Sequence, residues 1–119
     1  MKFRSSEILS DPVFTENRAL YKSMGFSDED LKGPLIGIAN AWNELVPGHY
    51  NLRQLSEFVK KGIYRAGGMA VEFGVIAACD GQSCGHNGMK YILPTRDLIA
   101  CDIEAMVEAH RLDGIVMLG

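Results

Sequence analysis

The stretch PLIGIAN (residues 34–40) is short and nearly all apolar. A run of this kind is typical of a strand that is buried on both faces of a parallel sheet. Two further runs, at residues 71–78 and 114–118, have the same character, although Glu72 and Gly74 weaken the pattern of the first of them. We therefore predict three buried strands, at residues 34–40, 71–78 and 114–118.

Apolar residues recur at helical spacing in both segments between these runs. In the first segment, Asn51 and Gln54 form a variant of the capping box, and Gly67 with Gly68 supplies a left-handed stop. The second helix opens at Thr95. The predicted apolar stripes are Leu52, Leu55, Phe58, Val59, Ile63 and Ala66 in the first helix, and Leu98, Ile99, Ile103, Met106, Val107 and His110 in the second.

The first thirty or so residues are polar and only weakly periodic. Thr15 is a candidate cap for a short helix that Gly25 ends. Ser27 with the acidic residues 28–30 predicts a second helical turn, because acidic groups favour the positive end of a helix. Gly33 and Pro34 end that turn.

The order strand, helix, strand, helix, strand requires parallel pairing with right-handed crossovers. Helices then cover both faces of the sheet, so we predict an α/β fold: one three-layer α/β/α domain that follows a helical N-terminal segment. Nothing in residues 1–119 reads as a linker between two domains. The third strand runs to Gly119 without a covering helix, which would leave an apolar edge exposed. We therefore expect the chain to be the front part of a longer protein.

Composition excludes several classes of protein. The 12 basic and 15 acidic residues give a net charge of −3 without a basic block, which argues against binding to nucleic acid or to a membrane surface. No apolar run approaches the roughly 18 residues that span a bilayer, and the start lacks the apolar core of a signal peptide. Three cysteines are too few for a disulfide framework. We expect a cytoplasmic protein with reduced cysteines.

Two long polar loops follow the first two strands, at residues 40–50 and 79–89. Ligands of open parallel sheets gather at the carboxyl ends of the strands, so these loops are the candidate site. Asp80 follows a strand directly, and its carboxylate is the kind of hard oxygen ligand that Mg²⁺ takes. The alternative is that Asp80 caps the turn at Gly81, and residue type alone favours this alternative. Trp42, the only tryptophan, either lines a pocket or covers the sheet.

Cysteine and histidine spacing does not match known metal motifs. Cys79, Cys84 and His86 lack the paired couples of a zinc site and fall short of an iron–sulfur set. On residue type, Cys79 is a small buried hydrophobe and Cys101 belongs to the helix core. The glycines of the second loop are spaced wrongly for a dinucleotide or phosphate loop.

The motifs in these loops resemble the dihydroxy-acid dehydratase and phosphogluconate dehydratase family, in the same order and over essentially the whole chain. The matching segments are Arg4-Ser5, Ile38-Ala39-Asn40, Trp42-Asn43-Glu44, Val46-Pro47-Gly48-His49, Leu52-Arg53, Ala66-Gly67-Gly68, Glu72-Phe73, Cys79-Asp80-Gly81, Gly85-His86, Gly88-Met89, Tyr91, Leu93-Pro94-Thr95-Arg96, Ile99-Ala100, Ile103-Glu104 and Ala109-His110.

This resemblance implies a hydro-lyase that removes water from a 2,3-dihydroxy acid to give a 2-keto acid. It implies an iron–sulfur cluster (2Fe–2S or 4Fe–4S) as Lewis acid on the leaving hydroxyl and Mg²⁺ at the carboxylate side, with Asp80 as the Mg²⁺ ligand. Residues 1–119 would be the N-terminal part of the cluster- and metal-binding domain, without the C-terminal barrel domain. The resemblance also implies a homodimer.

The remaining site residues also follow from the resemblance. Asn40, Trp42, His49 and His86 are the predicted pocket residues, and Cys79 is a candidate cluster ligand. Many members carry a cluster cysteine where this chain has Gly48, so no cluster ligand is assigned there. Cys84 stands where other members usually have methionine or another residue that is not a ligand. The catalytic base and the Cys-Asp-Lys motif would lie beyond Gly119, so we expect no catalytic residue within residues 1–119.

The leading hypothesis is therefore that the chain is part of a dihydroxy-acid dehydratase of branched-chain amino-acid synthesis. We expect the 119 residues to be inactive by themselves. The alternative within the class is a sugar-acid (aldonic acid) dehydratase. A non-catalytic α/β binding module, and a metal-storage or redox role for Cys79, Cys84 and His86, are the hypotheses from other classes.

Overall fold

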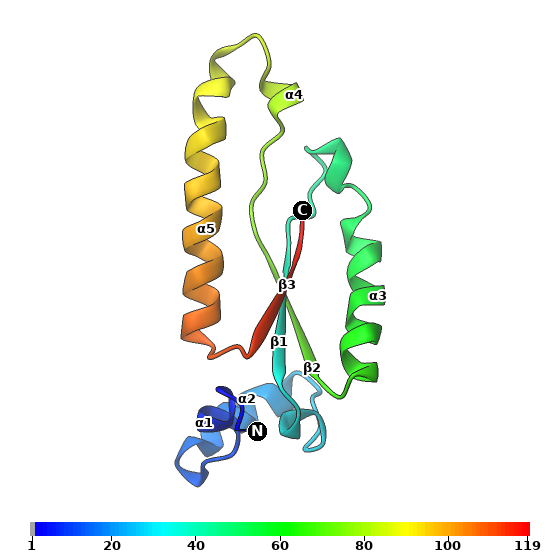
Figure 1. Cartoon of the computed structure of the whole chain (residues 1–119), viewed down its shortest axis with the longest axis vertical. Helices are drawn as coiled ribbons and strands as arrows, with labels where there is room; N and C mark the ends of the chain where they lie inside the picture. Colours follow the sequence, from blue (N-terminus) through cyan, green and yellow to red (C-terminus); the bar gives the residue numbers. More distant parts are fainter. Residues whose placement is uncertain (1) are drawn as a thin grey trace.

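The computed structural model describes residues 2–119 and contains one parallel sheet of three strands. The strands are β1 (Leu35–Asn40), β2 (Met69–Gly74) and β3 (Gly114–Leu118), and their order in the sheet is β2-β1-β3 (Figure 1). The predicted first and third strands are thereby confirmed. β1 is buried along most of its length because it pairs on both edges.

The predicted second strand is shifted. β2 begins at Met69, whose amide donates to the Pro34 carbonyl, and it ends at Gly74 rather than at Ala78. The amide of Val75 still donates to the Asn40 carbonyl, but β1 ends at Asn40 and offers no partner to later residues. Residues 75–79 are therefore a connection outside the ladder and not part of a strand.

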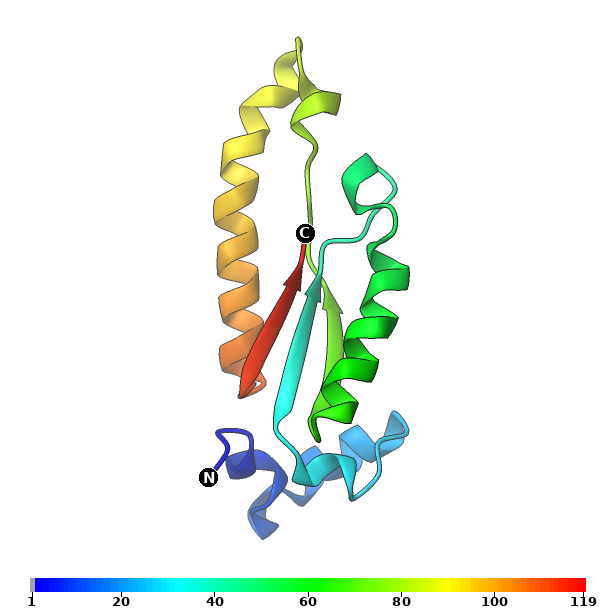
Figure 2. The same cartoon turned by 45° about the vertical axis from the view of Figure 1, so that its right-hand side comes forward.

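Two long helices cover the two faces of the sheet. α3 (Leu52–Arg65) connects β1 to β2, and α5 (Ile92–Ala109) connects β2 to β3. The second crossover runs back past β1, so right-handed connections place the two helices on opposite faces. Figures 1 and 2 show this arrangement, with the sheet between α3 and α5. The predicted three-layer α/β/α architecture is confirmed.

The predicted C-terminal ends of the helices agree with the structure more closely than their predicted N-terminal ends do. Asn51 is the N-cap of α3, but its side chain makes no capping hydrogen bond. Gly67 has a φ of 83°, and the amides of Gly67 and Gly68 donate to the carbonyls of Tyr64 and Ile63, which is the Schellman arrangement. α5 starts three residues before Thr95, whose hydroxyl donates to the Tyr91 carbonyl inside the helix.

The apolar stripes were predicted only in part. Leu52 is buried, but the fully buried residue of α3 is Ser56, and Phe58 is exposed. In α5, Leu98 is exposed, and so is Cys101, which the sequence placed in the core. The outer half of α5 extends beyond the sheet in Figure 1, which explains why its apolar residues lack cover.

The N-terminal segment packs under the amino ends of the strands (Figure 1). It contains α1 (Ser6–Leu9), the 3₁₀ turn η1 (Pro12–Phe14), α2 (Thr15–Ser23) and the 3₁₀ turn η2 (Asp30–Lys32). Thr15 is the first residue of α2 rather than its cap, whereas the predicted stop at Gly25 is confirmed by its φ of 98°. One core cluster joins this segment to the sheet: Leu9, Leu31, Leu35, Met69 and Leu112.

The carboxylate of Asp113 ties the same region together through hydrogen bonds. It accepts from the amide and hydroxyl of Ser5, at 2.9 and 2.5 Å, and from the amide of Leu35 at 2.7 Å. Asp113 therefore joins the N-terminal segment, the start of β1 and the start of β3. Burial raises the pKa of this carboxyl, but the donors from Ser5 and Leu35 outweigh burial and leave the pKa below its ordinary value.

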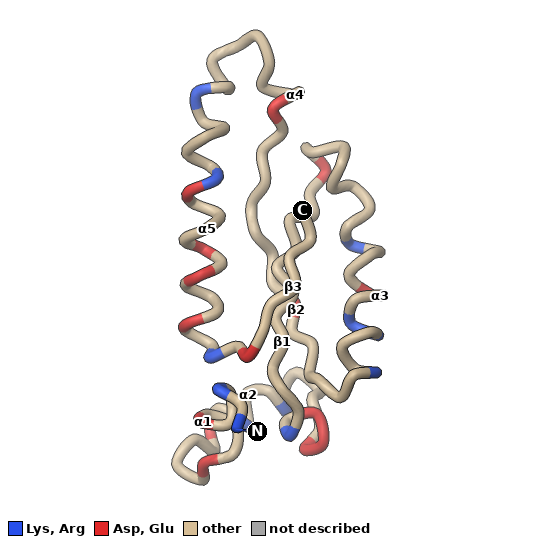
Figure 3. Tube along the Cα trace, in the orientation of Figure 1, with Lys and Arg blue, Asp and Glu red and all other residues tan. Residues whose placement is uncertain are grey.

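Charged side chains lie almost entirely outside the sheet (Figure 3). Glu72 is the one charged residue in the three strands. The molecule is elongated, with extents of 56 × 26 × 26 Å, because α4 (Asp80–Ser83) and the outer half of α5 project past the strands. None of the helices in residues 2–119 combines the length and the apolar character that crossing a lipid bilayer requires.

Replacement of Asp113 by asparagine is expected to lower the free energy of unfolding by about 1–3 kcal/mol at pH 7, because one acceptor oxygen becomes an amide that faces donors. Since the folded-state pKa is depressed, the wild-type contribution is present above about pH 4 and is lost as the pH falls further. Urea unfolding of both proteins from pH 7 to pH 3 measures this. Equal pH dependence of the two proteins would contradict it.

Candidate functional site at the carboxyl edge of the sheet

Two loops meet beyond the carboxyl ends of the strands. The first runs from residue 41 to residue 51 and contains the 3₁₀ turn η3 (Pro47–His49). The second runs from residue 75 to residue 91 and contains α4 and the 3₁₀ turn η4 (Asn87–Tyr91). Figure 2 shows η3 and α4 at the same end of the molecule. This is the edge that the sequence predicted as the site.

Asn40 is the last residue of β1, and its side chain is 4% exposed. Its amide nitrogen donates to Glu72 Oε1 at 2.8 Å, and its amide oxygen accepts from the Trp42 amide at 3.0 Å. A further, longer contact at 3.4 Å reaches the carbonyl of Leu52. Asn40 thus holds the first loop to β2 and α3 instead of presenting free polar atoms to a ligand.

Glu72 is the charged residue of β2, and it is not among the predicted site residues. Its carboxylate contacts Lys60 Nζ at 2.6 Å, and Lys60 also pairs with Glu57 at 2.8 Å. Burial raises the pKa of Glu72, but Lys60 and Asn40 outweigh it, so the pKa lies below its ordinary value. The signal for this network was present in the sequence, because a charge within a strand that is predicted to be buried needs a partner.

Trp42 and His49 are fastened to the backbone of the first loop. The indole N–H donates to the Tyr50 carbonyl at 3.1 Å, and the guanidinium of Arg53 lies 3.9 Å from the centre of the Trp42 ring. His49 Nδ1 donates to the carbonyl of Ala41 at 2.9 Å. A small hollow of about 140 Å³ lies beside them and is lined by Asn40, Trp42, Arg53, Glu72 and Gly74.

His86 is likewise used by its own loop. Its Nδ1 accepts from the amide of Gly88 at 3.0 Å, and its Nε2 donates to the carbonyl of Gln82 at 2.8 Å. The ring is exposed, but both nitrogens have a backbone partner. His86 therefore stabilises the second loop between α4 and η4.

Asp80 is the first residue of α4, and its side chain is 63% exposed. Its nearest charged partner is Arg96 Nη2 at 3.6 Å. No hydrogen bond occupies the carboxylate within residues 2–119, so the proposed cap of the Gly81 turn is not formed. Asp80 is thus the predicted site residue whose oxygens are accessible.

A hollow of about 340 Å³ separates the middle of the first loop from the start of the second. Asn43 crosses between the loops, because its Nδ2 donates to the carbonyl of Ala77 at 3.2 Å. The half-buried Cys79 lines this hollow, whereas Trp42 and His49 do not. The structure therefore places the Cys79–Asp80 segment beside the first loop, but not against its tryptophan. The lining residues are Glu44, Leu45, Ala77, Ala78, Cys79, Gln82 and Ser83.

The cysteines do not form a metal cluster with the other candidate ligands. Cys84 and Cys101 are exposed, and all three cysteines are free. In the described part of the chain, no group of three His, Cys, Asp or Glu side chains is placed to hold a metal ion. The metal-storage hypothesis for Cys79, Cys84 and His86 required such a group, and the structure does not bring it together.

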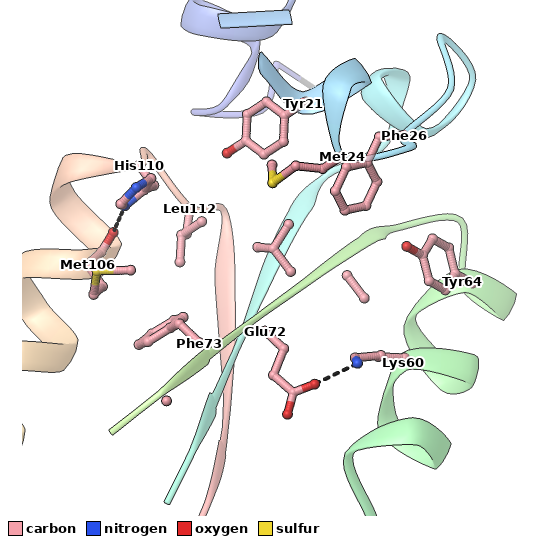
Figure 4. Close-up of a pocket in the computed structure, with 13 residues that line it drawn as sticks. Tyr21, Met24, Phe26, Lys60, Tyr64, Glu72, Phe73, Met106, His110 and Leu112 are labelled. Carbon is pink, nitrogen blue, oxygen red and sulfur yellow. Dashed lines mark hydrogen bonds and ion pairs between the residues drawn. The ribbon is translucent and has the colours of Figure 1, made fainter. Parts of the chain in front are cut away.

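The largest hollow, about 700 Å³, lies elsewhere, around the outer edge of β2 (Figure 4). Aromatic, methionine and aliphatic side chains line most of it, and its charged residues, Lys60 and Glu72, are paired with each other. None of the six predicted site residues lines it. The lining residues include Tyr21, Met24, Phe26, Tyr64, Phe73, Met106 and His110.

Comparison with known proteins gives consistent results. The family model described as "Dihydroxy-acid/6-phosphogluconate dehydratase N-terminal" matches residues 33–119, which begin just before β1. A dihydroxy-acid dehydratase of Methanoregula boonei is 57% identical over 98% of this chain, and one of Ignicoccus hospitalis is 52% identical over 97%. One of Archaeoglobus fulgidus is 50% identical over 97%. The chain spans about a fifth of the length of these relatives (21%).

Asn40→Asp is expected to destabilise the protein by about 1–3 kcal/mol at pH 7, because a second carboxylate then faces Glu72 without an amide donor. The loss should shrink as the pH falls, since neighbouring carboxylates raise the pKa of one of the pair and it becomes protonated. Urea unfolding at pH 7 and pH 4.5 measures both effects. The matched control is Asn51→Asp, where no side-chain bond is lost and an acidic group favours the helix N-terminus. Equal losses for both variants would refute the expectation.

Proposed function

Because the chain belongs to the dihydroxy-acid/6-phosphogluconate dehydratase N-terminal family, we propose that it is part of a hydro-lyase that converts a 2,3-dihydroxy carboxylic acid into a 2-keto acid. The observation that carries the proposal for this chain is Asp80. Its carboxylate is accessible, it stands at the carboxyl edge of a parallel sheet, and the residue before it, Cys79, lines the hollow between the two loops.

The residues present fit part of the cofactor set that the family implies. Mg²⁺ takes one or two protein carboxylates and completes its shell with water and substrate oxygens, so an exposed Asp80 suffices as its contribution from this chain. Cys79 presents a thiol to the hollow, and within residues 2–119 no further cysteine joins it there. Residues 2–119 thus offer one hard oxygen ligand and at most one cluster ligand.

The reaction removes hydroxide from C3 and a proton from C2, which together leave as water, and the enol then becomes the 2-keto acid. When bound, Mg²⁺ and an iron–sulfur cluster would supply the Lewis acidity that offsets the charge on the substrate carboxylate and on the leaving hydroxyl. Asp80 would hold the ion, and its nearest charged neighbour is Arg96, at 3.6 Å. Asn40 and Trp42 line the neighbouring hollow of about 140 Å³ with side-chain polar atoms that are already hydrogen-bonded, and His49 is held through its Nδ1.

The substrate that we propose is the dihydroxy acid of branched-chain amino-acid synthesis. The names of the relatives support this choice, because they are dihydroxy-acid dehydratases at 50–57% identity. A sugar acid is the second candidate, since the family description includes 6-phosphogluconate. We also propose a cytoplasmic homodimer for the enzyme; the three free cysteines are in keeping with a reducing compartment.

Mg²⁺ titration of the 119-residue protein tests the role of Asp80. We expect weak binding that Asp80→Asn reduces about tenfold or more, because the ion loses its protein carboxylate. Asp102→Asn is the matched control. It makes the same change at another exposed aspartate, on α5, and should leave binding unchanged. Isothermal titration calorimetry measures all three affinities. Equal affinities for the wild type and Asp80→Asn would contradict the proposed ligand.

The 119-residue protein by itself is expected to form no 2-keto acid from a 2,3-dihydroxy acid, because it holds no side chain that we can assign as the base for the C2 proton. An anaerobic assay with Mg²⁺ and reconstituted cluster, run beside a dihydroxy-acid dehydratase as positive control, measures the product. Turnover well above the background of the Asp80→Asn variant would overturn this expectation.

A further inference from the structure

The connection that carries Asp80 leaves the sheet with few hydrogen bonds, although Ala77 packs against the apolar cluster around Ala39 and Val75. The last ladder bond is the one from the Val75 amide to the Asn40 carbonyl, at 3.0 Å. The next backbone bond of the segment lies inside α4, from the Ser83 amide to the Cys79 carbonyl. Within residues 2–119, the hydrogen bond that reaches residues 76–79 from another element comes from Asn43 to the carbonyl of Ala77.

The side chain of Asn43 is itself fixed in direction. Its Oδ1 accepts from the amides of Leu45 and Val46, both at 2.8 Å, which closes the turn of the first loop. Val46 is buried and anchors that turn in the protein. Because the oxygen is committed to the first loop, the amide nitrogen must face the second loop, where it meets Ala77.

We infer that Asn43 is a positioning residue that sets where Asp80 stands, and this rests on the proposed role of Asp80. Asp80 lies three residues beyond Ala77 but five beyond Val75, which is roughly 10 Å against roughly 17 Å of extended chain. Loss of the bond from Asn43 would therefore lengthen the segment that no hydrogen bond fixes to the rest of the protein. The same bond crosses beside the hollow between the loops and sets the separation of Leu45 from Ala77.

Two variants isolate the inferred bond. Asn43→Asp keeps an oxygen for the amides of Leu45 and Val46 but cannot donate to Ala77. Asn43→Ala removes both functions. Asn87→Asp is the matched control, because it makes the same chemical change in η4 of the second loop.

The first readout needs no metal. In a background with Cys84→Ser and Cys101→Ser, the half-buried Cys79 is the one thiol, and its labelling by a maleimide reports how firmly residues 77–79 are held. We expect both Asn43 variants to label about fivefold faster, the factor that corresponds to one hydrogen bond of about 1 kcal/mol. The control should label at the wild-type rate. Circular dichroism first confirms that each variant is folded at the labelling temperature.

The second readout is Mg²⁺ affinity by calorimetry, in which we expect Asn43→Asp to bind several-fold more weakly than the control. Faster labelling together with weaker Mg²⁺ binding supports the inference. Wild-type labelling rates in a folded Asn43→Asp protein would overturn it, and so would unchanged affinity beside faster labelling. If the wild type itself binds no Mg²⁺, the proposed role of Asp80 fails, while the labelling rates still decide whether Asn43 holds the second loop.

Discussion

Pairing of β1 on both of its edges is the constraint on which the rest of the molecule depends. Both crossovers must return to this one strand, and that requirement places α3 and α5 on opposite faces. It also leaves the carboxyl end of β1 between the two loops that form the candidate site. Asp113 secures the opposite end, where the N-terminal segment, β1 and β3 meet on one carboxylate.

The limits of sequence-based prediction are clearest in the second strand. The apolar pattern continues from Val71 to Ala78, so the sequence predicted a strand there, but a strand ends where its neighbour stops offering hydrogen bonds. β1 stops at Asn40, and the residues after Val75 become a connection with strand-like composition. The third strand has no such mismatch, and the structure confirms its predicted bounds of residues 114–118.

The candidate site shows a similar division. The position of Asp80 after a buried segment predicted an accessible carboxylate, and the structure has one. Residue type could not predict that the side-chain oxygen and nitrogen of Asn40 and the Nδ1 of His49 are occupied by neighbours, because that depends on which chain segments meet after folding. The pairing of Glu72 with Lys60 was recognisable in principle, since the two come from adjacent elements and a charge within an otherwise apolar run calls for an opposite one.

The β2-β1-β3 order also has a consequence for synthesis on the ribosome. The central strand emerges first, yet its earliest partner, β2, begins 34 positions after it, at Met69 opposite Leu35. Until that partner arrives, an apolar segment with two open edges is exposed, and such segments are prone to pair with other nascent chains.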